Sequence, residues 1–145
     1  MNQLFRISAL LAFLAVGVFQ AQAQTVVIVN ASVPSSTFSV EEVMDVYTLN
    51  KTHWDNGARV TVFDLKEGQA KRAFYEYIGM TEDDLQRIWL RKQFTGRARP
   101  PHSLSNETEL VERVGKTPGG IGYASESAVR GKKNVRIIAR LKGAP

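Results

Sequence analysis

The chain has 145 residues, no cysteine, and 19 Lys and Arg against 14 Asp and Glu, which gives a formal net charge of +5 at pH 7. The lack of cysteine excludes disulfides, thiol catalysis and thiolate metal sites. The two histidines, His53 and His102, form no pair with the spacing of metal ligands, and the sequence has neither an RNA-recognition motif nor a zinc-finger spacing. We therefore expect no metal, no cofactor and no nucleic-acid partner.

Residues 1–23 have the features of a secretory signal peptide. A positive charge at Arg6 precedes an apolar run over 7–19, and the small residues Ala21 and Ala23 mark a cleavage site. The apolar run is shorter than the roughly 20 residues that a membrane-spanning helix needs. A retained membrane anchor is the alternative interpretation. We expect cleavage near Ala23 and a periplasmic mature chain, 24–145, that forms one domain.

The first half of the mature chain alternates strand and helix signals. An apolar run without polar alternation is typical of a strand buried on both faces. Ser39 with Glu42 forms a capping box before apolar residues at helical spacing. The predicted elements here are a strand over 25–29, a helix from Ser39 to Tyr47, a strand over 58–63 and a helix over 70–78 that stops at Gly79.

The second half continues this alternation. Thr81 precedes an acidic first helical turn, whose charge complements the positive end of a helix. Asn106 with Glu109 indicates the start of another helix. The predicted elements here are a helix after Thr81 with Trp89 on its apolar side, a loop over 94–101, a helix from Asn106 to Gly115, and strands over 121–124 and 135–139. The alternation predicts an α/β fold with a partly parallel sheet. Trp54 and Trp89 are expected in or near the core, and Gly119, Gly120 and Gly122 are expected to serve backbone geometry.

Four short blocks carry a resemblance to a known family. They are Val26-Val27-Ile28-Val29-Asn30 with Pro34-Ser35-Ser36, then Ser39 through Gly57 with its Trp54-Asp55-Asn56-Gly57 end, then Phe94-Thr95-Gly96-Arg97, and last Thr117-Pro118-Gly119-Gly120-Ile121-Gly122-Tyr123. In this order the blocks resemble the periplasmic phosphate-binding proteins, and specifically small single-lobe relatives with the type 2 periplasmic binding fold. The resemblance implies a three-layer α/β lobe with a mixed, partly parallel sheet.

The same resemblance implies an anion site at the loop that precedes the second helix. In the family this loop holds phosphate with backbone N–H groups and small hydroxyls at a helix start. Here Leu65 stands where the family has an arginine, and only Gly68 of the Gly-Ser-Gly-Thr pattern is kept. The candidate ligand-binding residues are Lys66, Gly68, Gln69, Ala70, Lys71 and Arg97. A plain strand-to-helix connection, and an arginine that is solvated or paired with a carboxylate, are the alternatives.

The sequence favours a binding protein over an enzyme. Neither histidine has the context of a hydrolase triad, and the cluster Glu82-Asp83-Asp84 is explained by helix capping. The resemblance implies binding of phosphate or a related small anion, with an ABC permease as partner. The alternative is a degenerate lobe that docks on another envelope protein complex or associates with itself.

Overall fold

The computed structural model describes residues 24–34 and 37–142. The predicted signal peptide, 1–23, lies outside these residues, as do Ser35 and Ser36 of the first block of the resemblance. The described part contains the predicted mature chain almost entirely.

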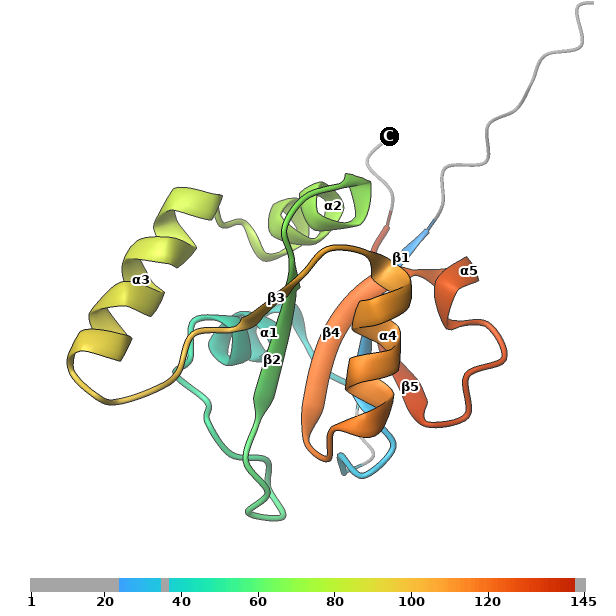
Figure 1. The fold of residues 1–145 in the computed structure, drawn as a ribbon, viewed down its shortest axis with the longest axis horizontal. Helices are drawn as coiled ribbons and strands as arrows, with labels where there is room; N and C mark the ends of the chain where they lie inside the picture. Colours follow the sequence, from blue (N-terminus) through green and yellow to red (C-terminus); the bar gives the residue numbers. More distant parts are fainter. Residues whose placement is uncertain (1–23, 35–36, 143–145) are drawn as a thin grey trace, which may run out of the picture.

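Five strands form one mixed sheet in the order β3-β2-β4-β1-β5 (Figure 1). β2 runs parallel to both β3 and β4, whereas β1 is antiparallel to its neighbours β4 and β5. The sheet is therefore partly parallel, as the alternation of elements predicts. The strands are β1 (Thr25–Asn30), β2 (Thr61–Leu65), β3 (His102–Leu104), β4 (Gly120–Ser125) and β5 (Val135–Arg140).

The helices begin where the sequence places their caps. Ser39 and Thr81 each form a capping box, with Glu42 and Asp84 respectively, and Asn106 accepts a hydrogen bond from the Glu109 amide. These bonds satisfy amide groups that a helix start leaves free. The helices are α1 (Val40–Tyr47), α2 (Gln69–Ile78), α3 (Glu82–Phe94), α4 (Glu107–Lys116) and α5 (Glu126–Val129).

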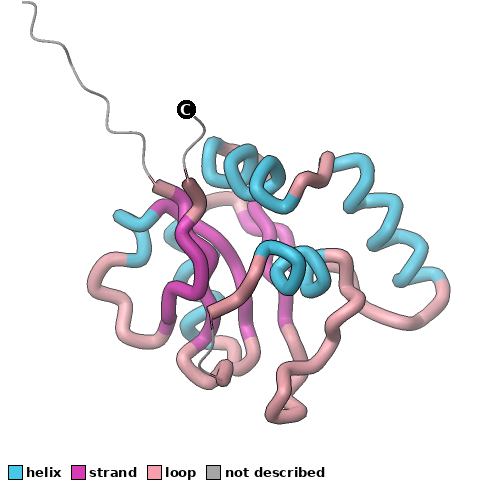
Figure 2. The backbone as a smooth tube through the Cα atoms, turned by 180° about the vertical axis from the view of Figure 1, so that it is seen from behind, coloured by secondary structure: helices cyan, strands magenta, loops and turns pink. Residues whose placement is uncertain are grey.

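The sheet lies between two helical layers, which Figure 2 shows from behind. Adjacent strand residues face opposite sides of a sheet. Tyr123 packs against Tyr47 of α1 and Phe74 of α2, while a Cβ at Gly122 would lie 2.6 Å from Leu110 of α4. The architecture is therefore the three-layer α/β lobe that the resemblance implies.

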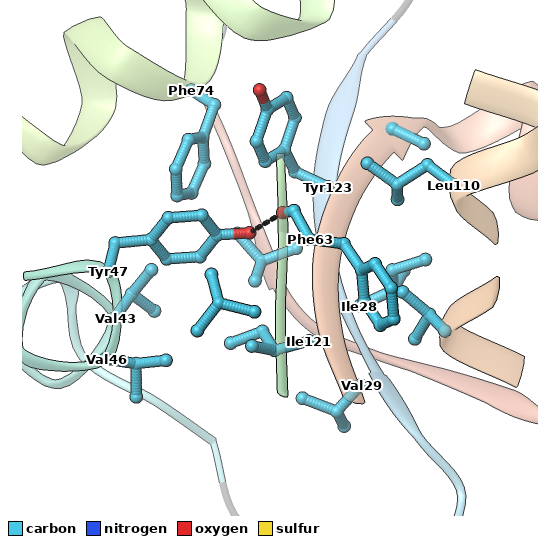
Figure 3. Packing of buried hydrophobic residues seen from close by; sticks show 14 of the residues in the cluster. Ile28, Val29, Val43, Val46, Tyr47, Phe63, Phe74, Leu110, Ile121 and Tyr123 are labelled. Atoms are coloured by element: carbon cyan, nitrogen blue, oxygen red, sulfur yellow. Dashed lines mark hydrogen bonds between the residues drawn. The ribbon is translucent and has the colours of Figure 1, made fainter. Parts of the chain in front are cut away.

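An aromatic cluster fills the layer between β4 and the pair α1 and α2 (Figure 3). The rings of Phe74 and Tyr123 stack at 4.2 Å, and the Tyr47 ring lies 4.5 Å from that of Phe74. The hydroxyl of Tyr47 donates a hydrogen bond to the Phe63 carbonyl at 2.8 Å, so this polar group is satisfied inside the core. The cluster fixes α1 and α2 against the sheet.

Helix α3 extends away from the body of the molecule (Figure 1). Of its residues only Leu85 is fully buried, and Trp89 attaches it to α1 through an indole hydrogen bond to the Tyr47 carbonyl at 2.7 Å. Leu90 and Phe94 remain 52% and 88% exposed. Trp89 is thus near the core and Trp54 is within it, as predicted.

Candidate functional site

The start of α2 is the feature that the sequence singled out for anion binding. Gly68 is the N-cap residue, with a φ of 113°, and no side chain accepts a hydrogen bond from the first amides of the helix. Such amides have no partner within a helix and carry the positive end of its dipole. The backbone at Gln69 and Ala70 can therefore donate to an anion.

A hollow of about 400 Å³ opens beside this helix start. We call it the α2 hollow; its charged lining residues are Lys66, Glu67, Lys71, Arg72 and Glu82, and Gly68 and Tyr75 also line it. Three cations and two carboxylates therefore share the hollow. The net positive charge of the lining is therefore small.

Lys71 is already engaged by the protein. Its side-chain ammonium lies 2.8 Å from a carboxylate oxygen of Glu82 and 3.9 Å from one of Asp64, and it donates to the Lys66 carbonyl at 3.3 Å. The residue is only 8% exposed. A buried cation with such partners is held in place and is not free to follow a ligand.

Asp64 is the acid at the centre of this arrangement. Its carboxylate accepts hydrogen bonds from the hydroxyls of Tyr75, at 2.7 Å, and Tyr123, at 2.5 Å. Burial raises the pKa of the Asp64 carboxyl, although the two tyrosine hydrogen bonds and the Lys71 charge partly offset this effect. Burial also raises the pKa of both tyrosines, so their hydroxyls stay protonated and donate.

Five of the six predicted site residues come together at α2. Lys66, Gly68 and Lys71 line the α2 hollow, and Gln69 and Ala70 follow in the first turn of the helix. Arg97 does not join them, because it lines a different hollow that is formed at the beginning of β2.

Asp64, Tyr75 and Tyr123 were not predicted as a group. An aspartate between the apolar residues Phe63 and Leu65, directly after the strand predicted over 58–63, was a usable signal, since a buried carboxylate needs partners. The two tyrosines could not be assigned to it, because their contact depends on how α2 and β4 pack around β2.

Comparisons with known proteins give a clear result at the level of the fold. No protein-family model and no curated protein matches the sequence. Solved structures do match. A protein described as a phosphate ABC transporter substrate-binding protein, with bound phosphate, from Clostridium perfringens superposes with a TM-score of 0.63 at 18% identity, over 79% of this chain and 44% of that one.

Two further structures agree. An ABC-type phosphate transport receptor from Vibrio cholerae gives a TM-score of 0.61 at 16% identity, over 79% of this chain and 45% of that one. PstS from Borrelia burgdorferi gives 0.62 at 12% identity, over 80% and 46%. This chain has the fold of one lobe of a phosphate-binding protein.

The lobe fold confirms the resemblance drawn from the four sequence blocks. The chain spans less than half the length of each of these three matched chains. Among the described residues, no helix of the lobe is both long and apolar enough to cross a membrane, and no cluster of three potential metal ligands is found.

Proposed function

We propose that this chain is an exported solute-binding lobe that binds phosphate or a related small anion at the start of α2, in the service of ABC-type uptake. The observation that carries the proposal is the lobe fold together with a glycine-capped helix start that opens into the α2 hollow. The proteins matched in fold are named as binding or transport proteins, which favours a binding role over an enzymatic one.

The binding chemistry rests on backbone amides and on two exposed cations of the α2 hollow, Lys66 and Arg72. The Gln69 and Ala70 region offers N–H donors, and Gly68 allows close approach because it has no Cβ. The exposed side chain of Lys66 can add a charge, while that of Lys71 is held by Glu82. We expect weaker binding than a site with a fixed arginine would give, since an ammonium lacks the two-pronged geometry of a guanidinium.

A second function is favoured by the same hollow. Glu67 and Glu82 bring negative charge to its lining, and the Lys71 ammonium is already neutralised. Leu90 and Phe94 are exposed on α3. These features suit an interaction module that docks on an envelope protein complex or on a second copy of itself.

Titration of the purified protein with phosphate, sulfate and small carboxylates tests the first function. Calorimetry and thermal unfolding at low and moderate salt are suitable measurements. A ligand present at about a hundred times its dissociation constant stabilises the folded state by about 2.7 kcal/mol. We expect phosphate to raise the unfolding temperature.

Lys66→Ala locates the site, with Lys133→Ala as the control. Both lysines are exposed, but only Lys66 lines the α2 hollow. We expect the Lys66 variant to weaken phosphate binding severalfold and the Lys133 variant to leave it almost unchanged. No stabilisation by any of the anions, together with self-association in light scattering, would instead support the interaction module.

A further inference from the structure

A second hollow, of about 200 Å³, lies at the other end of β2 from the α2 hollow, next to Thr61 and Val62. Two loops far apart in the sequence form it, one before β2 and one between α3 and β3 (Figure 1). We call it the cationic hollow; its basic lining residues are Lys51, His53, Arg59, Arg97, Arg99 and His102. In the described part of the chain, no acidic residue lines it.

Within residues 24–34 and 37–142, no carboxylate forms an ion pair with the three arginines of the cationic hollow. Lys51 forms an ion pair with Asp55 at 3.1 Å, but the ion pairs among the described residues do not include Arg59, Arg97 or Arg99. A guanidinium group without a carboxylate partner keeps its N–H donors available. A bound anion can therefore accept hydrogen bonds from these arginines without displacing an ion pair among the described residues.

Backbone hydrogen bonds fix the conformation of each of the two loops that carry these cations. In the loop before β2, the Val60 amide donates to the Thr52 carbonyl at 2.9 Å, and His53 and Arg59 form an antiparallel bridge. In the second loop, the Arg97 amide donates to the Lys92 carbonyl at 3.0 Å. The backbone of both loops is therefore ordered before an anion binds, whereas the exposed side chains of Arg59, Arg97 and Arg99 are ordered on binding.

From this geometry we infer that the cationic hollow binds at least two phosphate groups at once, either on one molecule or on neighbouring lipid headgroups. Each phosphate monoester has a charge of about −1.5 to −2 near neutral pH. Two such groups match three unpaired guanidiniums and a partly neutralised lysine, whereas a single carboxylate does not. Guanidinium forks also suit phosphate oxygens bidentately. The volume of the hollow equals that of about seven water molecules in the liquid, which leaves room for a diphosphate.

Two sources can supply such groups, a soluble polyphosphorylated molecule or the headgroups of an anionic membrane. Phe94 ends α3 shortly before Arg97 in the sequence and is 88% exposed, which is a feature of surfaces that insert an aromatic ring at a membrane interface. The experiment therefore has two arms. One uses inorganic tripolyphosphate as the probe, and the other uses phosphatidic acid vesicles, whose headgroups are phosphate monoesters, with phosphatidylcholine vesicles as the neutral comparison.

The decisive variants are a pair of double substitutions. Arg97→Ala with Arg99→Ala removes two charges from the cationic hollow, and Arg87→Ala with Arg91→Ala removes two charges from exposed positions on α3 that do not line it. Binding is measured by calorimetry for the soluble probe and by co-sedimentation for the vesicles, at low and moderate salt. The unfolding temperature of each variant shows that it is folded.

We expect the first double variant to weaken binding at least about tenfold in the responsive arm, because charge-assisted hydrogen bonds are lost. The second should weaken it by less than about threefold, through long-range charge alone. Equal losses in both variants, or no binding in either arm, would overturn the inference. A loss with Lys66→Ala and none with the Arg97 pair would place the multiphosphate at the α2 hollow and would also contradict it.

This inference is independent of the proposed function. The α2 hollow and the cationic hollow share no lining residue and lie at opposite ends of β2. Phosphate binding that responds only to Lys66→Ala and tripolyphosphate or vesicle binding that responds only to the Arg97 pair would support both. Either site can fail while the other stands.

Discussion

Asp64 couples the stability of the fold to pH. Burial raises the pKa of its carboxyl, because water stabilises the charge better than the protein interior does. The folded state therefore binds this proton more tightly than the unfolded chain, in which an aspartate titrates near pH 4. The resulting stabilisation is complete below that pH and is lost as the pH rises through the folded-state pKa.

Asp64→Asn should remove this pH dependence. The amide keeps the size of the side chain but does not titrate, so the variant should gain stability relative to the wild type as the pH rises above about 4. Urea unfolding at several pH values between about 4 and 8 measures the effect. Asp83→Asn, on an exposed residue of the first turn of α3, serves as the control. Parallel pH profiles for wild type and Asp64→Asn would contradict the assignment.

Tyr123→Phe should test the hydrogen bonds around the same carboxylate. The Tyr123 hydroxyl donates to Asp64 and accepts from the Leu65 amide at 3.1 Å. Phenylalanine keeps the ring stacked on Phe74 but leaves both buried groups short of a partner, which should lower the free energy of unfolding by about 1–3 kcal/mol. Tyr77→Phe is the matched control, since that half-buried ring lies 6.5 Å from Phe74 without a comparable buried bond. Equal losses of unfolding free energy in the two variants would show that the hydrogen bonds of the Tyr123 hydroxyl do not stabilise the fold.

At the scale of elements, the turn into β4 depends on glycine. Gly119 has a φ of 76°, and a Cβ there would lie 2.1 Å from the Arg59 carbonyl oxygen. Its own carbonyl accepts bonds from the Trp54 indole at 2.9 Å and from the Thr61 amide at 3.1 Å. The turn therefore fixes the loop before β2 against β4, as the predicted role of this glycine in backbone geometry requires.

Gly119→Ala and Gly57→Ala separate backbone strain from crowding. Both glycines have positive φ, but nothing lies within 4 Å of a Cβ at Gly57. Gly57→Ala should cost about 1–2 kcal/mol through strain alone. Gly119→Ala should cost about 1–3 kcal/mol more, because the Arg59 carbonyl must move. Chemical unfolding of the two variants measures the difference, and similar losses would mean that the turn adapts freely.

The sequence predicted elements best where a local signal marks their ends. The caps at Ser39, Thr81 and Asn106 are confirmed, since each needs only its own helix turn. The strand expected over 58–63 lies at Thr61–Leu65 instead, because Trp54 and Ala58 close a turn through a backbone bond at 2.8 Å. The sequence did not predict β3. Only Leu104 of its three residues is buried, and the strand forms by pairing with β2, which is far away in the sequence.

The candidate site was likewise predictable only where a local sequence signal marks it. The glycine-capped start of α2 follows from local sequence, and the structure places it where expected. The ion pair between Lys71 and Glu82 joins two helices across an intervening turn, and the position of Arg97 depends on how far α3 extends from the sheet. Such contacts arise from packing, which residue spacing alone does not determine.

At the scale of the whole molecule, we predict that export removes residues 1–23. β1 begins at Thr25, so cleavage after Ala23 would leave this strand complete. N-terminal sequencing and intact-mass measurement of a periplasmic fraction should show a chain that starts at Gln24. Ala23→Phe should block this processing, because the peptidase reads small residues there. Full-length protein recovered from the cytosol would contradict the prediction.

The two ends of the described chain leave the sheet together. Val26 pairs with Arg140, and the Leu141 amide donates to the Thr25 carbonyl at 3.0 Å (Figure 1). β1 is antiparallel to β4, and β4 is parallel to β2. The start of β1 therefore lies at the same end of the sheet as the end of β2, where β2 leads into α2. A fluorescent fusion, affinity handle or immobilising linker at either end would therefore start from the same side of the molecule as the α2 hollow and from the side opposite the cationic hollow. Surface-capture assays should therefore be anchored through a side chain far from both ends.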